Sequence, residues 1–256
     1  REAAKYGIGI VLDGVFSHTG SDSRYFNREG RYGDGGAYRD PNSPYRSWYD
    51  FDPKYKGGYR SWWGFETLPE VNEENPSYVE FITGEGGVID TWLRRGAAGF
   101  RLDVADELPD DFIEKIRAAV KRVSPEKFLL GEVWEDATTK YGFGQRRTYL
   151  LGKGLDSVMN YPFKNAVLDF VKGKPAEQAM GEILSICEHY PAPAMDTALN
   201  FLSTHDTERA LTVIADEPAN GRGREWQSGR CVTGEAYEEG MLRLRMAYAI
   251  IYTLPG

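Results

Sequence analysis

Short apolar runs alternate with helical patterns along most of this 256-residue chain, and this alternation limits the possible folds more than any other feature. A helical pattern between two apolar runs predicts a β–α–β unit, and continuous apolar strands are typical of a parallel sheet covered by helices. Six strands fit an α/β barrel that lacks part of itself, and a doubly wound parallel sheet is the alternative. The predicted strands are 8–13, 99–104, 128–134, 157–163, 197–204 and 249–255, and the predicted helices are 78–95, 109–123, 176–189 and 238–249.

A segment of different amino-acid composition follows the first predicted strand. Residues 23–72 are rich in Gly, Tyr, Trp, Asp and Pro and have almost no aliphatic periodicity. Long loops inside compact domains are usually functional. In a barrel, this one would emerge on the face formed by the carboxyl ends of the strands, where active sites are built.

The composition excludes several partners. A formal charge of −8 disfavours nucleic acid and anionic membrane surfaces, and a neutral substrate fits better. The sequence has no run of about eighteen apolar residues that would span a membrane, and its beginning does not resemble a signal peptide. Cys187 and Cys231 form neither a disulfide framework nor a zinc motif, so we interpret them as free thiols, which favours the cytoplasm.

Polar residues gather where the predicted strands end. Side chains alternate along a strand, so Arg101 and Asp103 are expected to share one face while Phe100 and Leu102 share the other. A lone acid or histidine at a strand end is more often structural than catalytic. Several such residues, however, are expected at the same end of the predicted sheet. They are Asp13, His18, Arg101, Asp103, Glu132, His205 and Asp206.

Three acids at the ends of different strands favour one reaction in particular. Converging carboxylates repel each other, so keeping Asp103, Glu132 and Asp206 together costs stability unless chemistry uses them. Cleavage of a glycosidic bond needs one carboxylate as nucleophile and a second that protonates the leaving oxygen. A third can stabilise the positive charge on the sugar ring. Arg101 would keep the nucleophile ionised, and one or two of the loop aromatics would stack on sugar rings in addition to forming the loop's own core.

Four ordered segments resemble those of the α-amylase family of glycoside hydrolases over the whole chain. The segments are DGVFSH (13–18), GFRLDVADE (99–107), GEVWEDA (131–137) and FLSTHDTER (201–209), and LPEVN (68–72) is similar to an additional segment near the end of the inserted domain. The amino-acid sequences of several of these segments, and of MNYPF (159–163), are most similar to those of the neopullulanase and cyclomaltodextrinase branch. Members of that branch act on maltooligosaccharides, cyclodextrins and pullulan.

The resemblance implies a role for each matching residue. Asp103 matches the nucleophile, Glu132 the general acid/base and Asp206 the stabiliser of the transition state. Arg101 matches the residue that positions the nucleophile, and Asp13 a mainly structural acid. The matching substrate-binding residues are His18, Arg101, His205 and Trp134.

The resemblance also implies a (β/α)8 TIM barrel represented by its third to eighth strands. The expected parts are a barrel strand at 1–16, an inserted loop-rich domain B at 17–77 and the remainder of the barrel at 78–256. A barrel without its first two strands has two open sheet edges, so we expect this part of the protein to be marginally stable and inactive by itself. No cofactor is expected, and calcium is not predicted at Ser17, where many members have Asn, because a hydroxyl is the poorer ligand.

We therefore expect a retaining α-glucan hydrolase with an oligosaccharide substrate, with or without transglycosylation, and a homodimer for the full-length protein. Two alternatives stay open at this point. One is a non-catalytic α-glucan-binding protein on the same fold. The other is an isomerase or glucosyltransferase of the same family that uses the same acids and excludes water.

Overall fold

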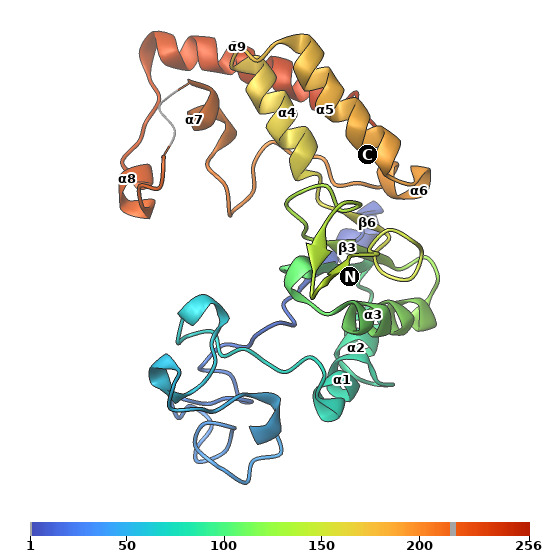
Figure 1. The fold of residues 1–256 in the computed structure, drawn as a ribbon, viewed down its shortest axis with the longest axis vertical. Helices are drawn as coiled ribbons and strands as arrows, with labels where there is room; N and C mark the ends of the chain where they lie inside the picture. Colours follow the sequence, from blue (N-terminus) through green and yellow to red (C-terminus); the bar gives the residue numbers. More distant parts are fainter. Residues whose placement is uncertain (1, 216–218) are drawn as a thin grey trace. The chain divides into compact units, whose positions relative to one another are not determined.

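The computed structural model describes residues 2–215 and 219–256 and divides into two compact units, which are treated separately below. The first unit comprises Arg1–Glu132 and Tyr141–Asp156, and the second comprises Val133–Lys140 and Ser157–Gly256. Figure 1 labels the helices and strands of both units. No helix in the described part of the chain is long and apolar enough to cross a membrane.

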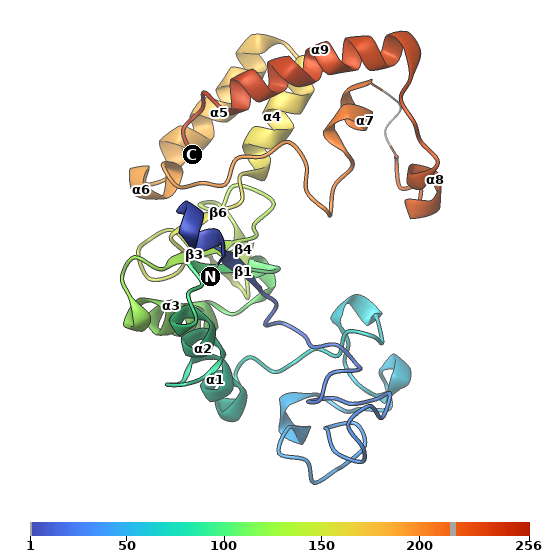
Figure 2. The same cartoon turned by 180° about the vertical axis from the view of Figure 1, so that it is seen from behind.

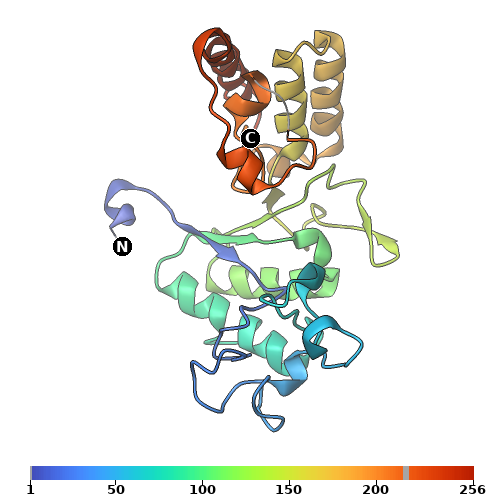
Figure 3. The ribbon, with the colours of Figure 1, turned by 90° about the vertical axis from the view of Figure 1, so that its left-hand side faces the viewer.

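A parallel sheet forms the centre of the first unit. Strands β1 (Val11–Gly14), β2 (Gly99–Leu102) and β3 (Phe128–Gly131) are adjacent in this order, and Asp13 pairs with Arg101 in the register. Helices α1 (Pro76–Thr83), α2 (Val88–Arg94) and α3 (Asp110–Val123) lie together on one side of this sheet (Figure 3). The sheet therefore has the parallel, helix-covered arrangement that the sequence pattern predicts.

The helix predicted at 78–95 is interrupted. Helix α1 begins after Asn75, whose side chain accepts hydrogen bonds from the backbone N–H groups of Ser77 and Tyr78. It ends at Thr83, and α2 begins after Gly87, with Gly86 between them in the left-handed region at φ 75°. Three glycines at 84, 86 and 87 break the helix because they are poor helix formers. By contrast, α3 agrees with the predicted helix 109–123 within one residue.

The loop-rich segment is held by an aromatic core. It contains the short helices η2 (Arg46–Trp48), η3 (Lys56–Gly58) and η4 (Trp62–Gly64). The fully buried ring of Phe26 contacts four other rings, and Trp48, Tyr49 and Tyr59 are also buried. Most loop aromatics thus form the segment's own core, as the sequence analysis expected.

Three smaller elements complete the first unit. They are η1 (Ala3–Tyr6), η5 (Ala105–Glu107) and the hairpin of β4 (Tyr141–Gly142) and β5 (Gln145–Arg146). Buried Arg147 follows the hairpin and donates to an Asp110 carboxylate oxygen at 2.7 Å and to the backbone oxygens of Asp106 and Leu108. This arginine fixes the hairpin against the segment that follows β2.

The second unit is mainly helical. Helix α4 (Tyr161–Val171) packs against α5 (Ala176–His189), α7 (Ala210–Ala215) and α9 (Gly234–Ile251), as Figures 1 and 2 show. The predicted helix 176–189 matches α5, and the predicted helix 238–249 lies inside α9. The remaining elements are β6 (Ser157–Val158), α6 (Ala192–Met195) and α8 (Arg224–Ser228).

Three strand predictions in the second unit are wrong in whole or in part. Of 157–163 only β6 is a strand, because Asn160 caps α4 and Pro162 follows in its first turn. Of 197–204, only Leu199 forms a bridge, which is parallel and pairs it with Met159. Residues 249–251 of the last predicted strand belong to α9, where Gly240, Ala247 and Ile251 are buried on a helical repeat. A short apolar run fits either structure, and here the helical repeat decides.

Candidate functional site

Arg101 holds three carboxylates at the carboxyl end of the sheet. Its Nη1 donates to Asp103 Oδ1 at 2.6 Å and to Asp13 Oδ1 at 2.7 Å. Its Nη2 lies 2.7 Å from Glu132 Oε2, an ion pair without hydrogen-bond alignment. Burial acts to lower the pKa of Arg101, but the three acids outweigh it and raise the pKa above its ordinary value. The expected contact between Arg101 and Asp103 is therefore present, and the guanidinium is fully charged.

Glu132 is positioned by backbone as well as by Arg101. It follows β3 and is 3% exposed, and its backbone N–H donates to the oxygen of Leu102. The Val104 N–H donates to Glu132 Oε2 at 2.8 Å. Val104 adopts the left-handed region at φ 41° and ψ 49°, which is strained for a β-branched residue. This strained turn directs the N–H that follows Asp103 toward the second acid.

His18 lies beside the same acids. Its Nδ1 is 2.8 Å from the Ser17 hydroxyl, and its ring contacts the Trp62 ring with centroids 5.3 Å apart. Burial lowers the pKa of His18, and the negative charges of Asp103 and Glu107 only partly offset this effect. His18 is therefore mainly neutral at pH 7, when its ring has one nitrogen that donates and one that accepts hydrogen bonds.

The second unit contains the other predicted site residues. His205 Nε2 lies 3.1 Å from Asp206 Oδ2, and both residues are exposed. Trp134 stacks on Tyr161 with ring centroids 4.2 Å apart and is 40% exposed. The structure thus brings Asp13, His18, Arg101, Asp103 and Glu132 together in one unit, and His205 with Asp206 in the other. Convergence of Asp206 on Asp103 and Glu132 stays a prediction.

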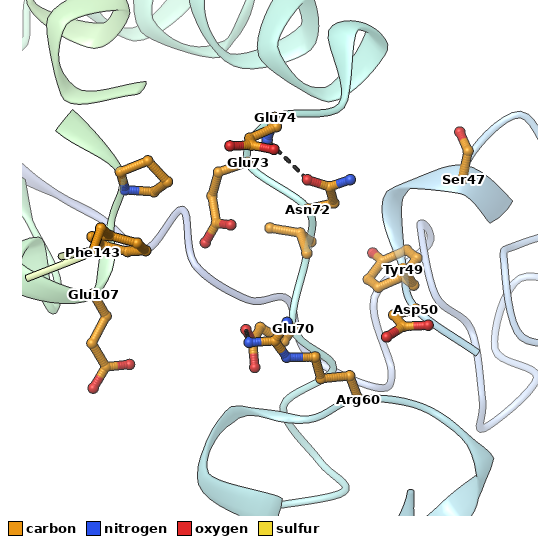
Figure 4. Close-up of a pocket in the computed structure, with 12 residues that line it drawn as sticks. Ser47, Tyr49, Asp50, Arg60, Glu70, Asn72, Glu73, Glu74, Glu107 and Phe143 are labelled. Carbon is orange, nitrogen blue, oxygen red and sulfur yellow. Dashed lines mark hydrogen bonds and ion pairs between the residues drawn. The ribbon is translucent and has the colours of Figure 1, made fainter. Parts of the chain in front are cut away.

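An acidic cavity of about 520 Å³ lies in the first unit (Figure 4). Its lining includes Glu70, Glu73 and Glu107, and Arg60 forms an ion pair with Glu70 at 2.8 Å. Burial raises the pKa of Glu73 to about 7, and the charge of nearby Glu70 adds to the rise. Sequence reasoning did not single out this cavity.

The absence of calcium at Ser17 stays a prediction. The Ser17 hydroxyl is buried and engaged with His18. Within residues 2–215 and 219–256, no group of three or more His, Cys, Asp or Glu side chains has an arrangement that could hold a metal.

The comparison with protein families decides the identity of the fold. The model of the α-amylase catalytic domain matches residues 1–228. The chain belongs to the α-amylase family. The predicted TIM-barrel class is therefore confirmed, and the parallel strands β1, β2 and β3 are part of the barrel of this family.

Several known α-amylase family proteins are similar to this chain. An amylopullulanase of Thermoanaerobacter thermohydrosulfuricus is 38% identical over 87% of the chain, and neopullulanase 2 of Thermoactinomyces vulgaris is 32% identical over 86%. The structure of the type III pullulan hydrolase from Thermococcus kodakarensis covers the whole chain with a TM-score of 0.78 and 27% identity, and the chain covers 41% of it. The predicted branch is therefore represented among the relatives. The chain spans 17% of that amylopullulanase and 36% of that neopullulanase.

Sequence reasoning missed the role of Glu107. This residue is the last of the segment GFRLDVADE (99–107), and its carboxylate accepts hydrogen bonds from the indole N–H groups of Trp62 and Trp63. Glu107 lies more than forty positions after the two tryptophans, so no local spacing indicates the contact. The only available signal is the position of Glu107, four residues after Asp103 in the same segment.

Proposed function

We propose that the whole protein is a retaining α-glucan hydrolase that acts on maltooligosaccharides, cyclodextrins or pullulan. The observation that supports it most strongly is the contact of Asp103 and Glu132 with one guanidinium, that of Arg101. Retaining glycosidases need two carboxyl groups about 5 Å apart, and a shared cation favours such a close pair. The names of the relatives, which include pullulan and cyclodextrin hydrolases, support the substrate class.

The proposed reaction has two steps. In the first, an Asp103 oxygen bonds to the anomeric carbon while Glu132 gives its proton to the departing glycosidic oxygen, so the bond breaks and a glycosyl ester forms. In the second, Glu132 takes a proton from water, the water oxygen bonds to the anomeric carbon, and Asp103 leaves as a carboxylate. Asp206 stabilises the positive charge of both transition states, while His18, His205 and Trp134 contact the sugar.

Glu132→Gln in the full-length protein tests this proposal. Because Gln cannot donate or accept the transferred proton, hydrolysis of maltotriose or β-cyclodextrin falls about 10²–10⁴-fold. Glu135→Gln is the matched control, since the Glu135 side chain is 62% exposed and is expected to be dispensable. NMR of the wild-type product detects the α-anomer first if the reaction is retaining. Near-normal activity of Glu132→Gln, or a β-anomer, contradicts the assignment.

We also propose the finer sequence expectations as properties of the whole protein. These are a barrel strand at 1–16, a domain B at 17–77, the rest of the barrel at 78–256, cytoplasmic location and a homodimer. The aromatic core of the loop-rich segment supports a separate domain B. Limited proteolysis near residues 17 and 77, together with sedimentation velocity, tests the boundaries and the dimer.

A further inference from the structure

The second unit contains a cavity of about 380 Å³ lined mainly by hydrogen-bond donors. Residues of the segment FLSTHDTER (201–209) and of helices α7 and α8 contribute to its lining. Three of the lining residues are arginines, and the lining contains one carboxylate, that of Glu208. We call it the arginine cavity, after Arg209, Arg224 and Arg230. Its volume lies within the range of cavities that bind small ligands.

Two of these arginines have no acidic partner in the described part of the chain. The sequence contains 39 Asp and Glu residues against 31 Lys and Arg, so carboxylates are abundant. Within residues 2–215 and 219–256, however, none forms an ion pair with Arg209 or Arg224. Glu208 Oε2 accepts a hydrogen bond from the Ala219 backbone N–H at 3.0 Å. Because like charges repel, three guanidinium groups around one cavity cost stability unless an anion joins them.

Contacts within residues 219–230 orient the third arginine. The ring of Trp226 lies close to two guanidinium groups, with its centroid 3.7 Å from Arg222 Cζ and 4.8 Å from Arg230 Cζ. Arg222 Nε donates to the Ala219 oxygen at 2.9 Å, and Gln227 Nε2 donates to the Arg222 oxygen at 3.3 Å. Stacking on an aromatic ring orients a planar guanidinium. A ligand of Arg230 therefore meets a side chain that has already lost part of its freedom.

The donors in this lining favour an anion with several acceptor oxygens. A guanidinium has five N–H donors and no acceptor, and the hydroxyl groups of Thr204, Thr207, Thr212 and Ser228 also line the cavity. A neutral sugar has no charge to balance the arginines. A phosphate group has a charge of about −1.5 to −2 at pH 7 and accepts paired hydrogen bonds from the guanidinium fork.

The neighbouring cavity of about 540 Å³ lacks this excess of positive charge. It shares His205 and Arg224 with the arginine cavity, but its lining combines three cations with three acids. These are Lys164, Arg222 and Arg224 on one side of the balance and Asp169, Asp206 and Glu208 on the other. The chemistry of an anion site is therefore confined to the arginine cavity of this pair.

We propose that the arginine cavity binds a phosphate group, either as free inorganic phosphate or as a phosphate ester carried by a sugar. Arg209 and Arg224 supply charge that no described acid neutralises, and Arg230 supplies a preoriented guanidinium. His205 lines the same cavity, so a sugar that carries the phosphate lies within reach of its imidazole. This inference goes beyond the proposed function and does not depend on it.

Calorimetry of the full-length protein at pH 7 tests the inference with inorganic phosphate, glucose 6-phosphate and glucose. We expect both anions to bind, more weakly as ionic strength rises, and glucose to leave the cavity empty. Glucose 6-phosphate that binds at least about tenfold more tightly than phosphate assigns the site to a sugar ester, and a smaller difference assigns it to free phosphate. No binding of either anion to the wild type overturns the inference, whether or not the protein cleaves glucans.

Arginine variants locate the site. Arg224→Gln and Arg209→Gln are each expected to weaken phosphate binding about 10–100-fold, because each removes charged hydrogen-bond donors. Arg224→Lys keeps the charge without the fork and is expected to lose less affinity.

Arg245→Gln is the matched control, because Arg245 is an exposed arginine of α9 that lines none of the cavities described. It removes the same charge and is expected to leave phosphate affinity nearly unchanged. The melting temperature of each variant without ligand shows whether it folds, and if Arg224→Gln does not fold, Arg209→Gln and Arg224→Lys decide. Unchanged affinity in the folded Arg209 and Arg224 variants, or an equal loss in Arg245→Gln, overturns the assignment to this cavity.

Discussion

We expect Glu73 to destabilise the folded protein above neutral pH and Glu73→Gln to remove this effect. Burial raises the pKa of Glu73 from its ordinary value of 4.5 to about 7. A group whose pKa is raised on folding binds its proton more tightly in the folded state, so its ionisation costs stability as pH rises from 4.5 to 7. At about 1.4 kcal/mol for each pKa unit, the cost reaches at most ~3 kcal/mol above pH 7, and the partial exposure of the side chain reduces it.

The assay is urea unfolding of wild type and Glu73→Gln at pH 5 and pH 8. The variant is expected to be more stable at pH 8 by ~1–3 kcal/mol and to gain less than half as much at pH 5. Glu74→Gln is the control, because it removes the same charge from the exposed neighbour and is expected to change stability by less than ~0.5 kcal/mol at either pH. Equal gains for Glu73→Gln at both pH values refute the reasoning.

Two further substitutions test buried charges. Arg101→Met leaves Glu132 buried without its cation and is expected to lower the free energy of unfolding in urea by ~3–5 kcal/mol. Arg101→Lys is expected to have an intermediate effect, because one ammonium group cannot reach three acids. A decrease under ~1 kcal/mol for Arg101→Met would contradict this expectation. Asp90 is 1% exposed, and despite the opposing effect of burial, Arg122, Arg94 and the Gly86 N–H lower its pKa. Asp90→Asn is therefore expected to lower the melting temperature at pH 7. The difference in melting temperature from the wild type is expected to shrink as pH falls below about 4, where the wild-type carboxylate becomes protonated. A difference that stays constant with pH would show that the lost charge of Asp90 is not its cause.

Sequence periodicity predicted the parts of the site that depend on one strand or on adjacent strands. The period of two places Arg101 and Asp103 on one face, and the structure shows their contact at 2.6 Å. Glu132 follows the neighbouring parallel strand, so the sheet itself brings it to the same end. These contacts follow from local pattern because a parallel sheet aligns the carboxyl ends of its strands.

Contacts between distant segments could not be predicted in this way. The bonds from Trp62 and Trp63 to Glu107 depend on how the loop-rich segment packs, and no local pattern encodes this packing. The apolar run at 249–255 shows a second limit. It has the residue types of a strand, but the pairing partners that a strand needs come from elsewhere in the chain, whereas a helix satisfies its own backbone hydrogen bonds.

The ring of Phe26 has a consequence for how the loop-rich segment moves. It is fully buried among the rings of Tyr38, Tyr49, Phe51 and Tyr59. In an interior packed as densely as a crystal, a ring so enclosed can flip only when its neighbours move outward together. Each flip of the Phe26 ring therefore requires one collective expansion of the segment around it. The stretches of backbone that carry these five rings are therefore expected to move together rather than residue by residue.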